Sequence, residues 1–442
     1  MRFLARCGMA AAFLGLATAP AFAGDEAKVD TGDAAWMLIS TAIVLMMTVP
    51  GVALFYAGMV RKKNVLATMM QSFSICALVS VLWMVAGYSL AFGEGNAWIG
   101  DFSRFFLGGL AENWDKPFTL GSGDAAVATT IPESIFLTFQ MTFAVITAAL
   151  ITGAVADRMK FSALLVFIGL WTLLVYSPVA HWVWHPNGWI FSLGALDFAG
   201  GTVVHINAGV AGLVAAIVLG KRVGYGSDNL SPYNLAFAVI GAALLWVGWF
   251  GFNAGSNLEA TGIAVLALLN TILATAAAAL AWMLIETLVT KKPSMLGIAS
   301  GAIAGLVAVT PAAGLIGPMG SIILGAIGGI ACFFAVTSLK KALGYDESLD
   351  VFGIHGVGGI VGAIGTGIFV SPALGGVGVD GYDMGSQVTT QTLGVLVAIG
   401  WSGTVSFVLF KLIDLTIGLR VKEEDEREGL DTTSHGERAY TN

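Results

Sequence analysis

Charged residues are scarce in this sequence. Of its 442 residues only 11% are charged, whereas 57% are hydrophobic, and the mean hydropathy is +0.83. Soluble domains carry about 25% charged residues. A chain of this length with so few charges could not cover a water-facing surface, so most of its surface must face lipid or other helices. The few basic residues are scattered, which argues against nucleic-acid binding.

Cysteine is rarer still, with three copies in the chain. Cys76 and Cys332 lie in apolar runs, where a thiol packs as a small buried side chain. The spacing fits neither a disulfide framework nor a metal site. The sequence also offers no nucleophile–base set and no cofactor motif. We therefore predict neither an enzyme nor a resident metal or cofactor.

Residues 1–23 have the features of a secretory signal peptide. Arg2 and Arg6 form its basic end, an apolar stretch follows, and Ala21–Ala23 supplies a small-x-small cleavage pattern. The alternative is an uncleaved first membrane helix, but Pro20 interrupts a short apolar stretch that charges soon follow. We predict cleavage, which places the mature N-terminus outside.

Long apolar segments fill the rest of the chain. A membrane helix needs about 20 residues, and about eleven segments meet that length. The predicted spans are 34–60, 65–92, 132–156, 161–180, 200–219, 235–254, 262–289, 295–313, 319–339, 353–370 and 390–418. We predict an all-α integral membrane domain over 24–419, followed by a cytoplasmic tail over 420–442.

The charges in the loops set the direction of these spans. Cytoplasmic loops are enriched in Lys and Arg. If the first span runs inward, the basic loop residues on the inner side are Arg61, Lys62, Lys63, Arg158, Lys160, Lys221, Arg222, Lys291, Lys292, Lys340 and Lys341. The outer loops carry only Arg104 and Lys116. The pattern predicts an N-out, C-in multi-pass protein of the cytoplasmic (inner) membrane.

A weak internal similarity links the fifth and tenth spans. Val204–Gly212 and Ile354–Gly362 each contain a histidine followed seven residues later by a glycine on the same helix face. Five spans separate the two strings, so their directions through the membrane are opposite. This is the arithmetic of an inverted five-plus-five repeat, a common transporter plan. The eleventh span lies outside the repeat.

The two histidines in these strings, His205 and His355, lie within apolar spans. An ionisable group at membrane depth is costly and indicates function by default. Each lies roughly five to eight residues, or about 8–12 Å, from its own membrane face. They approach the midplane from opposite sides, so modest tilts or broken helix starts would bring them together. A contacting pair offers polar groups in an apolar path; the alternative is two separate histidines bonded to backbone carbonyls.

Two further features flank the outer face. Asp197 precedes the fifth span, where an acid either caps the helix or attracts a cation. Several aromatic residues lie near the same face, some of them four residues apart and thus on one helix face. They are either an interfacial belt or a cation cage. These residues are Phe139 and Phe143 on one segment, Trp184 in the loop after the fourth span, and Phe252 with Ser256 at the end of the sixth.

The chain resembles the bacterial ammonium transporters of the Amt/Mep/Rh family over essentially its whole mature length. Five strings carry the resemblance: Pro50–Gly58, Asp197–Asn207, Trp249–Ser256, Asp350–Gly356 and Glu424–Asp431. The resemblance implies two pseudo-symmetric halves plus one helix, assembled as a homotrimer with one pore per subunit. It also implies that the tail contacts a PII-type signal protein. The outer loop 93–131 fits the family pattern least well.

The resemblance also implies roles for the singled-out residues. Phe143, Trp184 and Ser256 would form an outer ammonium site, and Asp197 would support recruitment or deprotonation. Phe143 and Phe252 would stack as a gate, and Phe139, on the same helix face as Phe143, would be its third residue. His205 and His355 would be the twin histidines of the pore.

The mechanism expected from these roles is that ammonium binds outside and loses a proton, and that neutral ammonia crosses the apolar pore. Two alternatives stay open. A neutral-gas facilitator would need no outer cation site. An ammonium sensor acting through a cytoplasmic partner would be expected to add a signalling domain, whereas only residues from 419 onward follow the last predicted span.

Overall fold

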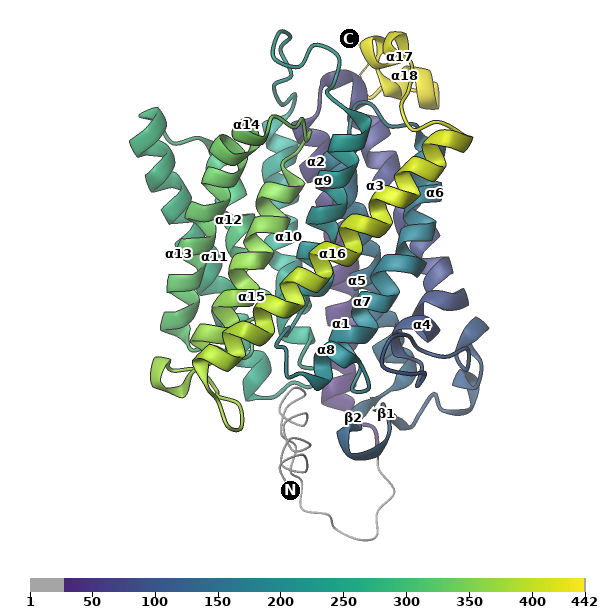
Figure 1. Ribbon diagram of the computed structural model, residues 1–442, viewed down its shortest axis with the longest axis vertical. Coiled ribbons are helices and arrows are strands. Elements are labelled where there is room, and N and C mark those ends of the chain that lie inside the picture. Colours follow the sequence, from purple (N-terminus) through teal and green to yellow (C-terminus); the bar gives the residue numbers. More distant parts are fainter. Residues whose placement is uncertain (1–27, 441–442) are drawn as a thin grey trace.

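The computed structural model describes residues 28–440 and is a bundle of membrane-length helices (Figure 1). The predicted signal peptide, 1–23, lies outside the described residues. A two-stranded hairpin, β1 (Pro117–Leu120) and β2 (Val127–Pro132), lies at one end of the bundle. The short tail helices α17 (Glu423–Glu428) and α18 (Leu430–His435) lie at the other. We call these the hairpin end and the tail end.

The described residues contain ten helices long and apolar enough to cross a membrane. They are Thr31–Met59 (α1 to α2), Lys62–Phe92 (η3 to α4), Glu133–Val155 (α5), Phe161–Ser192 (α6 to α8), Gly201–Leu219 (η9 and α9), Leu235–Gly255 (α10), Gly262–Thr290 (α11), Pro318–Leu343 (α13 to α14), Phe352–Phe369 (η11 and α15) and Met384–Thr416 (α16). A shorter apolar helix, α12 (Met295–Val309), occupies the predicted eighth segment.

The predicted end of the fourth span is wrong at a candidate site residue. The fourth span does not end at residue 180, because π-helical η8 (Thr172–Tyr176) leads into α7 (Ser177–Trp184). Pro178 lies in the first turn of α7, where a missing N–H is tolerated. Trp184 is therefore the last residue of a helix rather than part of a loop. Its indole Nε1 donates to Asp197 O at 2.9 Å.

Small residues allow the helices of the second half to approach closely. A Cβ on Gly305 of α12 would lie 2.6 Å from the carbonyl oxygen of Ala274 in α11. A Cβ on Gly329 of α13 would lie 2.6 Å from that of Ala278. These glycines bring backbones into contact, which is the packing mode of membrane helices. The long helix α16 crosses the bundle diagonally and packs against α9 and α15 (Figure 1).

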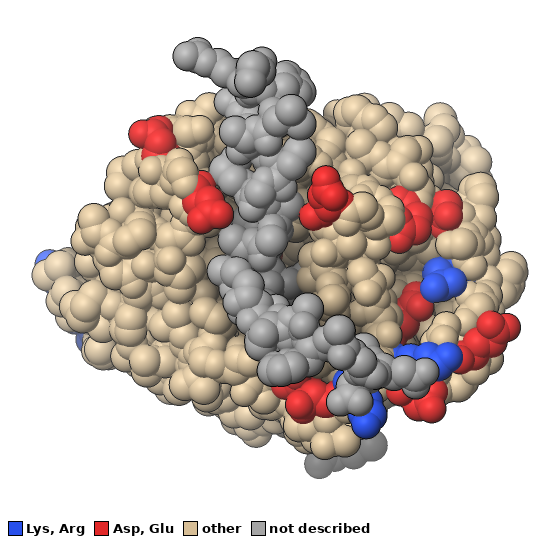
Figure 2. All heavy atoms as spheres, turned by 90° about the horizontal axis from the view of Figure 1, so that it is seen from below, with Lys and Arg blue, Asp and Glu red and all other residues tan. Residues whose placement is uncertain are grey.

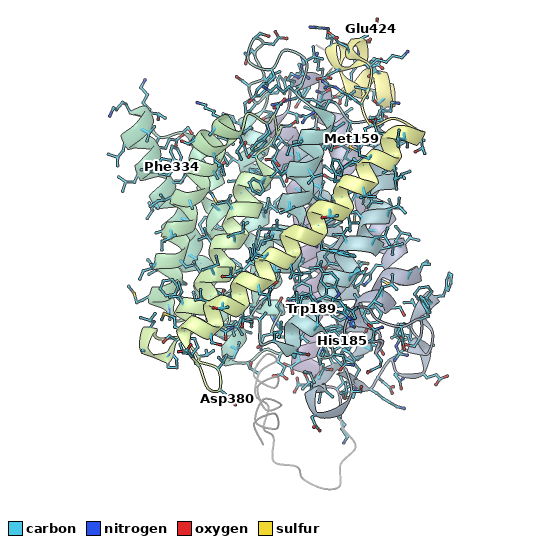
Figure 3. The ribbon with its side chains drawn as sticks, in the orientation of Figure 1. Met159, His185, Trp189, Phe334, Asp380 and Glu424 are labelled. Atoms are coloured by element: carbon cyan, nitrogen blue, oxygen red, sulfur yellow. The ribbon has the colours of Figure 1, made fainter. Side chains whose placement is uncertain are left out.

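The two ends of the bundle differ in charge. The basic loops lie at the tail end: Lys160 N donates to Leu419 O at 2.8 Å, and Val421 N donates to Arg158 O at 3.0 Å. Acidic side chains outnumber basic ones on the face seen at the hairpin end (Figure 2). Glu424 and Asp380 mark the opposite ends (Figure 3). This distribution matches the loop-charge pattern read from the sequence.

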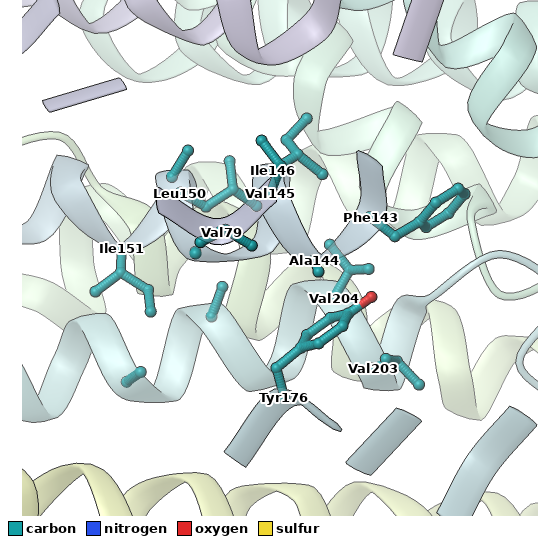
Figure 4. Close-up of a cluster of buried hydrophobic side chains, with 14 of the residues drawn as sticks. Val79, Phe143, Ala144, Val145, Ile146, Leu150, Ile151, Tyr176, Val203 and Val204 are labelled. Carbon is teal, nitrogen blue, oxygen red and sulfur yellow. The ribbon is translucent and has the colours of Figure 1, made fainter. Parts of the chain in front are cut away.

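The first-half core surrounds α5, most of whose side chains are buried. Val145 and Ile146 of α5 pack in one cluster with Tyr176 of η8 and Val204 of η9 (Figure 4). The core thus reaches the start of the fifth span, η9 (Gly201–Ile206), which carries His205. Packing on α5 therefore positions both Phe143 and His205.

Candidate functional site

A cavity of about 60 Å³ lies near the hairpin end, and we call it the mouth cavity. Its lining includes all four residues predicted to recruit ammonium: Phe143, Trp184, Asp197 and Ser256. Phe143 and Trp184 meet edge to face, with ring centroids 5.8 Å apart and planes at 88°. Ser256 Oγ donates to Phe252 O at 2.8 Å, which leaves the hydroxyl lone pairs free to accept. The cavity therefore combines aromatic surfaces with a hydroxyl acceptor.

On the side of the mouth cavity that faces the middle of the bundle, two phenylalanines stack face to face. The rings of Phe143 and Phe252 are 4.2 Å apart with planes at 30°. Phe143 lines the mouth cavity, whereas Phe252 lines the next cavity along the bundle. The stacked pair separates the two. Phe139 is fully buried, contacts Phe143 at 4.9 Å, and is absent from the lining of both cavities.

The next space, which we call the pore cavity, is only about 10 Å³ and contains both predicted histidines. His205 Nδ1 and His355 Nδ1 are 3.2 Å apart, and their rings are nearly parallel at 18°. One ring must donate its N–H to the lone pair of the other. The His205 ring also stacks on Trp249, at 5.4 Å between centroids. The remaining nitrogen of His205, Nε2, is buried and has no partner among the described residues.

Broken helix starts bring the histidines together. His205 lies in the π-helical segment η9, and His355 lies in the π-helical segment η11 (Phe352–Gly356). Each segment enters from its own end of the bundle. Gly209 lets the two approach, because a Cβ there would lie 2.5 Å from Gly356 Cα. The predicted contact therefore rests on local departures from the α-helix.

Asp197 caps the first of these segments. Its Oδ1 accepts from Gly200 N at 3.0 Å and from Gly201 N at 2.6 Å. Its Oδ2 accepts from the next two backbone N–H groups, at 2.9 and 3.1 Å. Both oxygens are thus engaged, as the capping interpretation of the sequence expects. The carboxylate still lines the mouth cavity, where its negative charge favours a cation.

Glu347 occupies the corresponding position at the tail end. It precedes His355 by the same interval as Asp197 precedes His205. Both of its carboxylate oxygens lie within 3.0 Å of Phe352 N, the first residue of η11. Burial, reinforced by the charge of nearby Asp350, raises the pKa of Glu347 to about 8. The sequence analysis missed this residue, although its spacing from the histidine was a usable signal.

A third cavity, of about 200 Å³, opens toward the tail end, and we call it the inner cavity. It shares His355 with the pore cavity, together with Phe55, Tyr56 and Ile303. The mouth, pore and inner cavities therefore follow one another. The stacked Phe143 and Phe252 lie between the mouth and pore cavities, and His355 lies between the pore and inner cavities. Trp249, which supports His205, was part of a string quoted for the resemblance but had no assigned role.

The fold defines a multi-spanning membrane protein with three cavities that follow one another along the bundle. A model of the Ammonium Transporter Family matches residues 35–440. The chain is 51% identical to an ammonium transporter of Bacillus subtilis, with 92% of this chain and 98% of the relative covered. It is 49% identical to an ammonium transporter of Aquifex aeolicus, with 94% and 95% covered. The chain belongs to the ammonium transporter family.

Solved structures agree with this assignment. The crystal structure of Saccharomyces cerevisiae Mep2 superimposes with a TM-score of 0.80 at 34% identity, covering 90% of this chain and 89% of that one. A protein described as a sensor Amt protein superimposes with a TM-score of 0.83 at 28% identity, covering 91% and 98%. The predicted helical membrane fold and family are confirmed.

Proposed function

We propose that this ammonium transporter recruits ammonium in the mouth cavity, removes a proton there, and conducts ammonia past His205 and His355. The observation that carries the proposal is the pore cavity. It is about 10 Å³, lies between the stacked phenylalanines and the inner cavity, and holds the contacting histidine pair. Such a space admits a small neutral solute, whereas an ion stripped of water there would cost many kcal/mol.

The mouth cavity supports recruitment of the charged form. The faces of Phe143 and Trp184 attract a cation through their ring quadrupoles. Ser256 Oγ accepts one N–H of ammonium, and the Asp197 carboxylate adds a favourable negative field. Ammonium passes its proton to water in the mouth cavity as it approaches the Phe143–Phe252 stack, because the apolar side chains beyond the stack disfavour the ion. Ammonia then meets the free Nε2 of His205 and is reprotonated beyond His355.

Orientation and assembly complete the proposal. The hairpin end faces outward and the tail end faces the cytoplasm, which is supported by the basic loops at the tail end. The chain resides in the cytoplasmic membrane as a homotrimer with a pore in each subunit. The exposed tail acids, including Glu424, fit a docking surface for a PII-type signal protein.

The experiment that tests recruitment compares wild type with Ser256→Ala in proteoliposomes. Initial ammonium flux is measured against concentration, with methylammonium as competitor and carbon dioxide permeability as a second readout. We expect Ser256→Ala to raise the half-saturation concentration by about tenfold to a hundredfold, the value of one hydrogen bond to a charged group. Carbon dioxide transport that methylammonium fails to inhibit, without ammonium flux, would favour the neutral-gas alternative. A sensor would bind ammonium without flux.

A further inference from the structure

A short irregular segment forms one wall of the mouth cavity. Residues 193–200, between α8 (Trp189–Ser192) and η9, form neither helix nor strand, and we call them the recruitment loop. Three residues of this loop line the mouth cavity: Ala195, Asp197 and Phe198. The carbonyl of Asp197 also accepts from Trp184 Nε1 at 2.9 Å. The position of the loop therefore sets where both the carboxylate and the indole lie.

A single glutamine of α16 binds the backbone of this loop. Gln391 Oε1 accepts from Leu196 N at 2.5 Å, and Gln391 Nε2 donates to Leu196 O at 2.7 Å. The side-chain amide thus pairs with both backbone groups of the residue that precedes Asp197. Gln391 Nε2 also donates to Ala363 O of α15, at 2.9 Å. One amide therefore ties the recruitment loop to two helices.

These hydrogen bonds lie where water does not replace them. Gln391 is 3% exposed and Leu196 is 1% exposed. The Leu196 side chain packs in an apolar cluster with Leu315 and Ile316. A buried backbone N–H or C=O that loses its partner costs free energy. The loop would consequently have to move, or admit water, if the amide of Gln391 were removed.

The other polar side chains of α16 differ in what they hold. One helical turn before Gln391, Gln387 Nε2 donates to Gly194 O at 2.9 Å and thus supports the same loop. Ser406, which is fully buried nearer the tail end, accepts from Trp171 Nε1 of α6 at 3.1 Å. The two glutamines bind the recruitment loop, whereas Ser406 binds a helix outside it.

We propose that Gln391 is a positioning residue for ammonium recruitment, which holds the Leu196 backbone and so places the Asp197 carboxylate and the Trp184 indole in the mouth cavity. The proposal rests on the recruitment function proposed above. Gln391 itself does not line the mouth cavity, and neither does any other residue of α16. It therefore acts on ammonium only through the loop.

The test compares three variants of the full chain with wild type. Gln391→Met keeps the length of the side chain while it removes both hydrogen-bonding groups. Gln387→Met is a milder variant that removes the hydrogen bond to Gly194 O. Ser406→Ala is the control, because it removes a buried hydrogen bond of the same helix outside the recruitment loop.

Two measurements are made on each variant. The first is the half-saturation concentration and maximal rate of initial ammonium flux in proteoliposomes. The second is hydrogen–deuterium exchange of peptides that cover residues 193–200, followed by mass spectrometry. The exchange measurement reports on the backbone of the loop and does not depend on transport.

We expect Gln391→Met to raise the half-saturation concentration about fivefold to tenfold and to leave the maximal rate within about twofold, because it misplaces recruitment groups and leaves the pore intact. Exchange of the loop should become at least about tenfold faster, since Leu196 N–H loses its acceptor. Gln387→Met should cause smaller shifts in the same direction. Ser406→Ala should change neither the half-saturation concentration nor the exchange of the loop.

A half-saturation concentration for Gln391→Met equal to that of wild type would overturn the positioning role, even if the loop exchanged faster. So would an equal loss of maximal rate in Gln391→Met and Ser406→Ala, which would indicate general destabilisation. If Gln391→Met does not fold, Gln387→Met decides by the same criteria. Absence of ammonium flux in wild type would refute the proposed function itself, whereas unchanged exchange of the loop in Gln391→Met would refute the positioning role separately.

Discussion

His205 Nδ1 and His355 Nδ1 lie 3.2 Å apart although 150 residues separate them in the chain. Their contact joins the two halves of the molecule at the narrowest point of the path. An acid precedes each histidine at the same interval and accepts hydrogen bonds from the start of its helix. The histidine pair is thus held from both ends by matching caps, Asp197 and Glu347.

The first prediction concerns the phenylalanine gate. Phe252→Leu removes the ring that stacks on Phe143 and should connect the mouth cavity with the pore cavity. We expect osmotic water permeability of proteoliposomes, measured by stopped-flow light scattering, to rise several-fold. Phe139→Leu is the matched control, because Phe139 lines neither cavity and should leave water permeability at the wild-type level. Equal permeability in the two variants would argue against a gate at Phe252.

The second prediction separates the two roles of Asp197. The Asp197 carboxylate accepts hydrogen bonds from four backbone N–H groups. Asn at this position would turn its amide N–H₂ toward two of these four donors, which would then lose their acceptor. We expect Asp197→Asn to reduce the free energy of unfolding by about 2–4 kcal/mol. The measurement is the thermal unfolding midpoint in detergent, which should be lower for Asp197→Asn than for wild type. Unchanged stability with abolished transport would mean that the carboxylate acts only on the substrate.

The third prediction is a pH dependence set by Glu347. Burial raises its pKa to about 8 in the folded protein, from an ordinary value of 4.5. Between these values the folded state binds the proton more tightly than the unfolded state, so stability falls as pH rises from about 4.5 to 8. Glu347→Gln removes this contribution while keeping an acceptor for Phe352 N.

Thermal unfolding midpoints from pH 5 to pH 9 check the Glu347 prediction. The decline between pH 5 and 8 should be shallower in Glu347→Gln than in wild type. Glu424→Gln, an exposed tail residue, should follow the wild-type curve. Identical slopes for Glu347→Gln and wild type would show that Glu347 is not the titrating group.

The fourth prediction concerns the tail. Asp431 Oδ1 accepts from Ala67 N at 2.8 Å and so caps α3 (Val65–Leu82), whose own N-cap side chain makes no such bond. Leu430 N donates to Asn64 Oδ1 at 2.8 Å beside it. We expect Asp431→Ala to release the tail and to speed its cleavage in limited proteolysis about tenfold. Glu428→Ala, on the exposed side of the tail, is the control; equal cleavage rates would contradict the anchoring role.

The sequence predicted the fold well because membrane spans are coded by length and apolarity, which are local properties. It also indicated that His205 and His355 could meet, since they enter from opposite membrane faces, but it left open whether tilted helices or broken helix starts would bring them together. It missed the helical position of Trp184, because hydropathy does not show that η8 and α7 continue the fourth span. It also missed the stacking of Trp249 on His205 and the cap by Glu347, which depend on side-chain packing between distant segments.

The most direct test of the central claim replaces both pore histidines. Proteoliposomes with wild type or His205→Ala/His355→Ala receive an ammonium pulse, and flux is followed by internal pH and by current. His435→Ala, in the tail, controls for loss of a histidine elsewhere. We predict that the double variant loses ammonium flux by at least about tenfold or loses selectivity for ammonium, because the contacting pair of imidazoles is gone from the pore cavity. Full ammonium-selective flux in the double variant would contradict the pore assigned to His205 and His355.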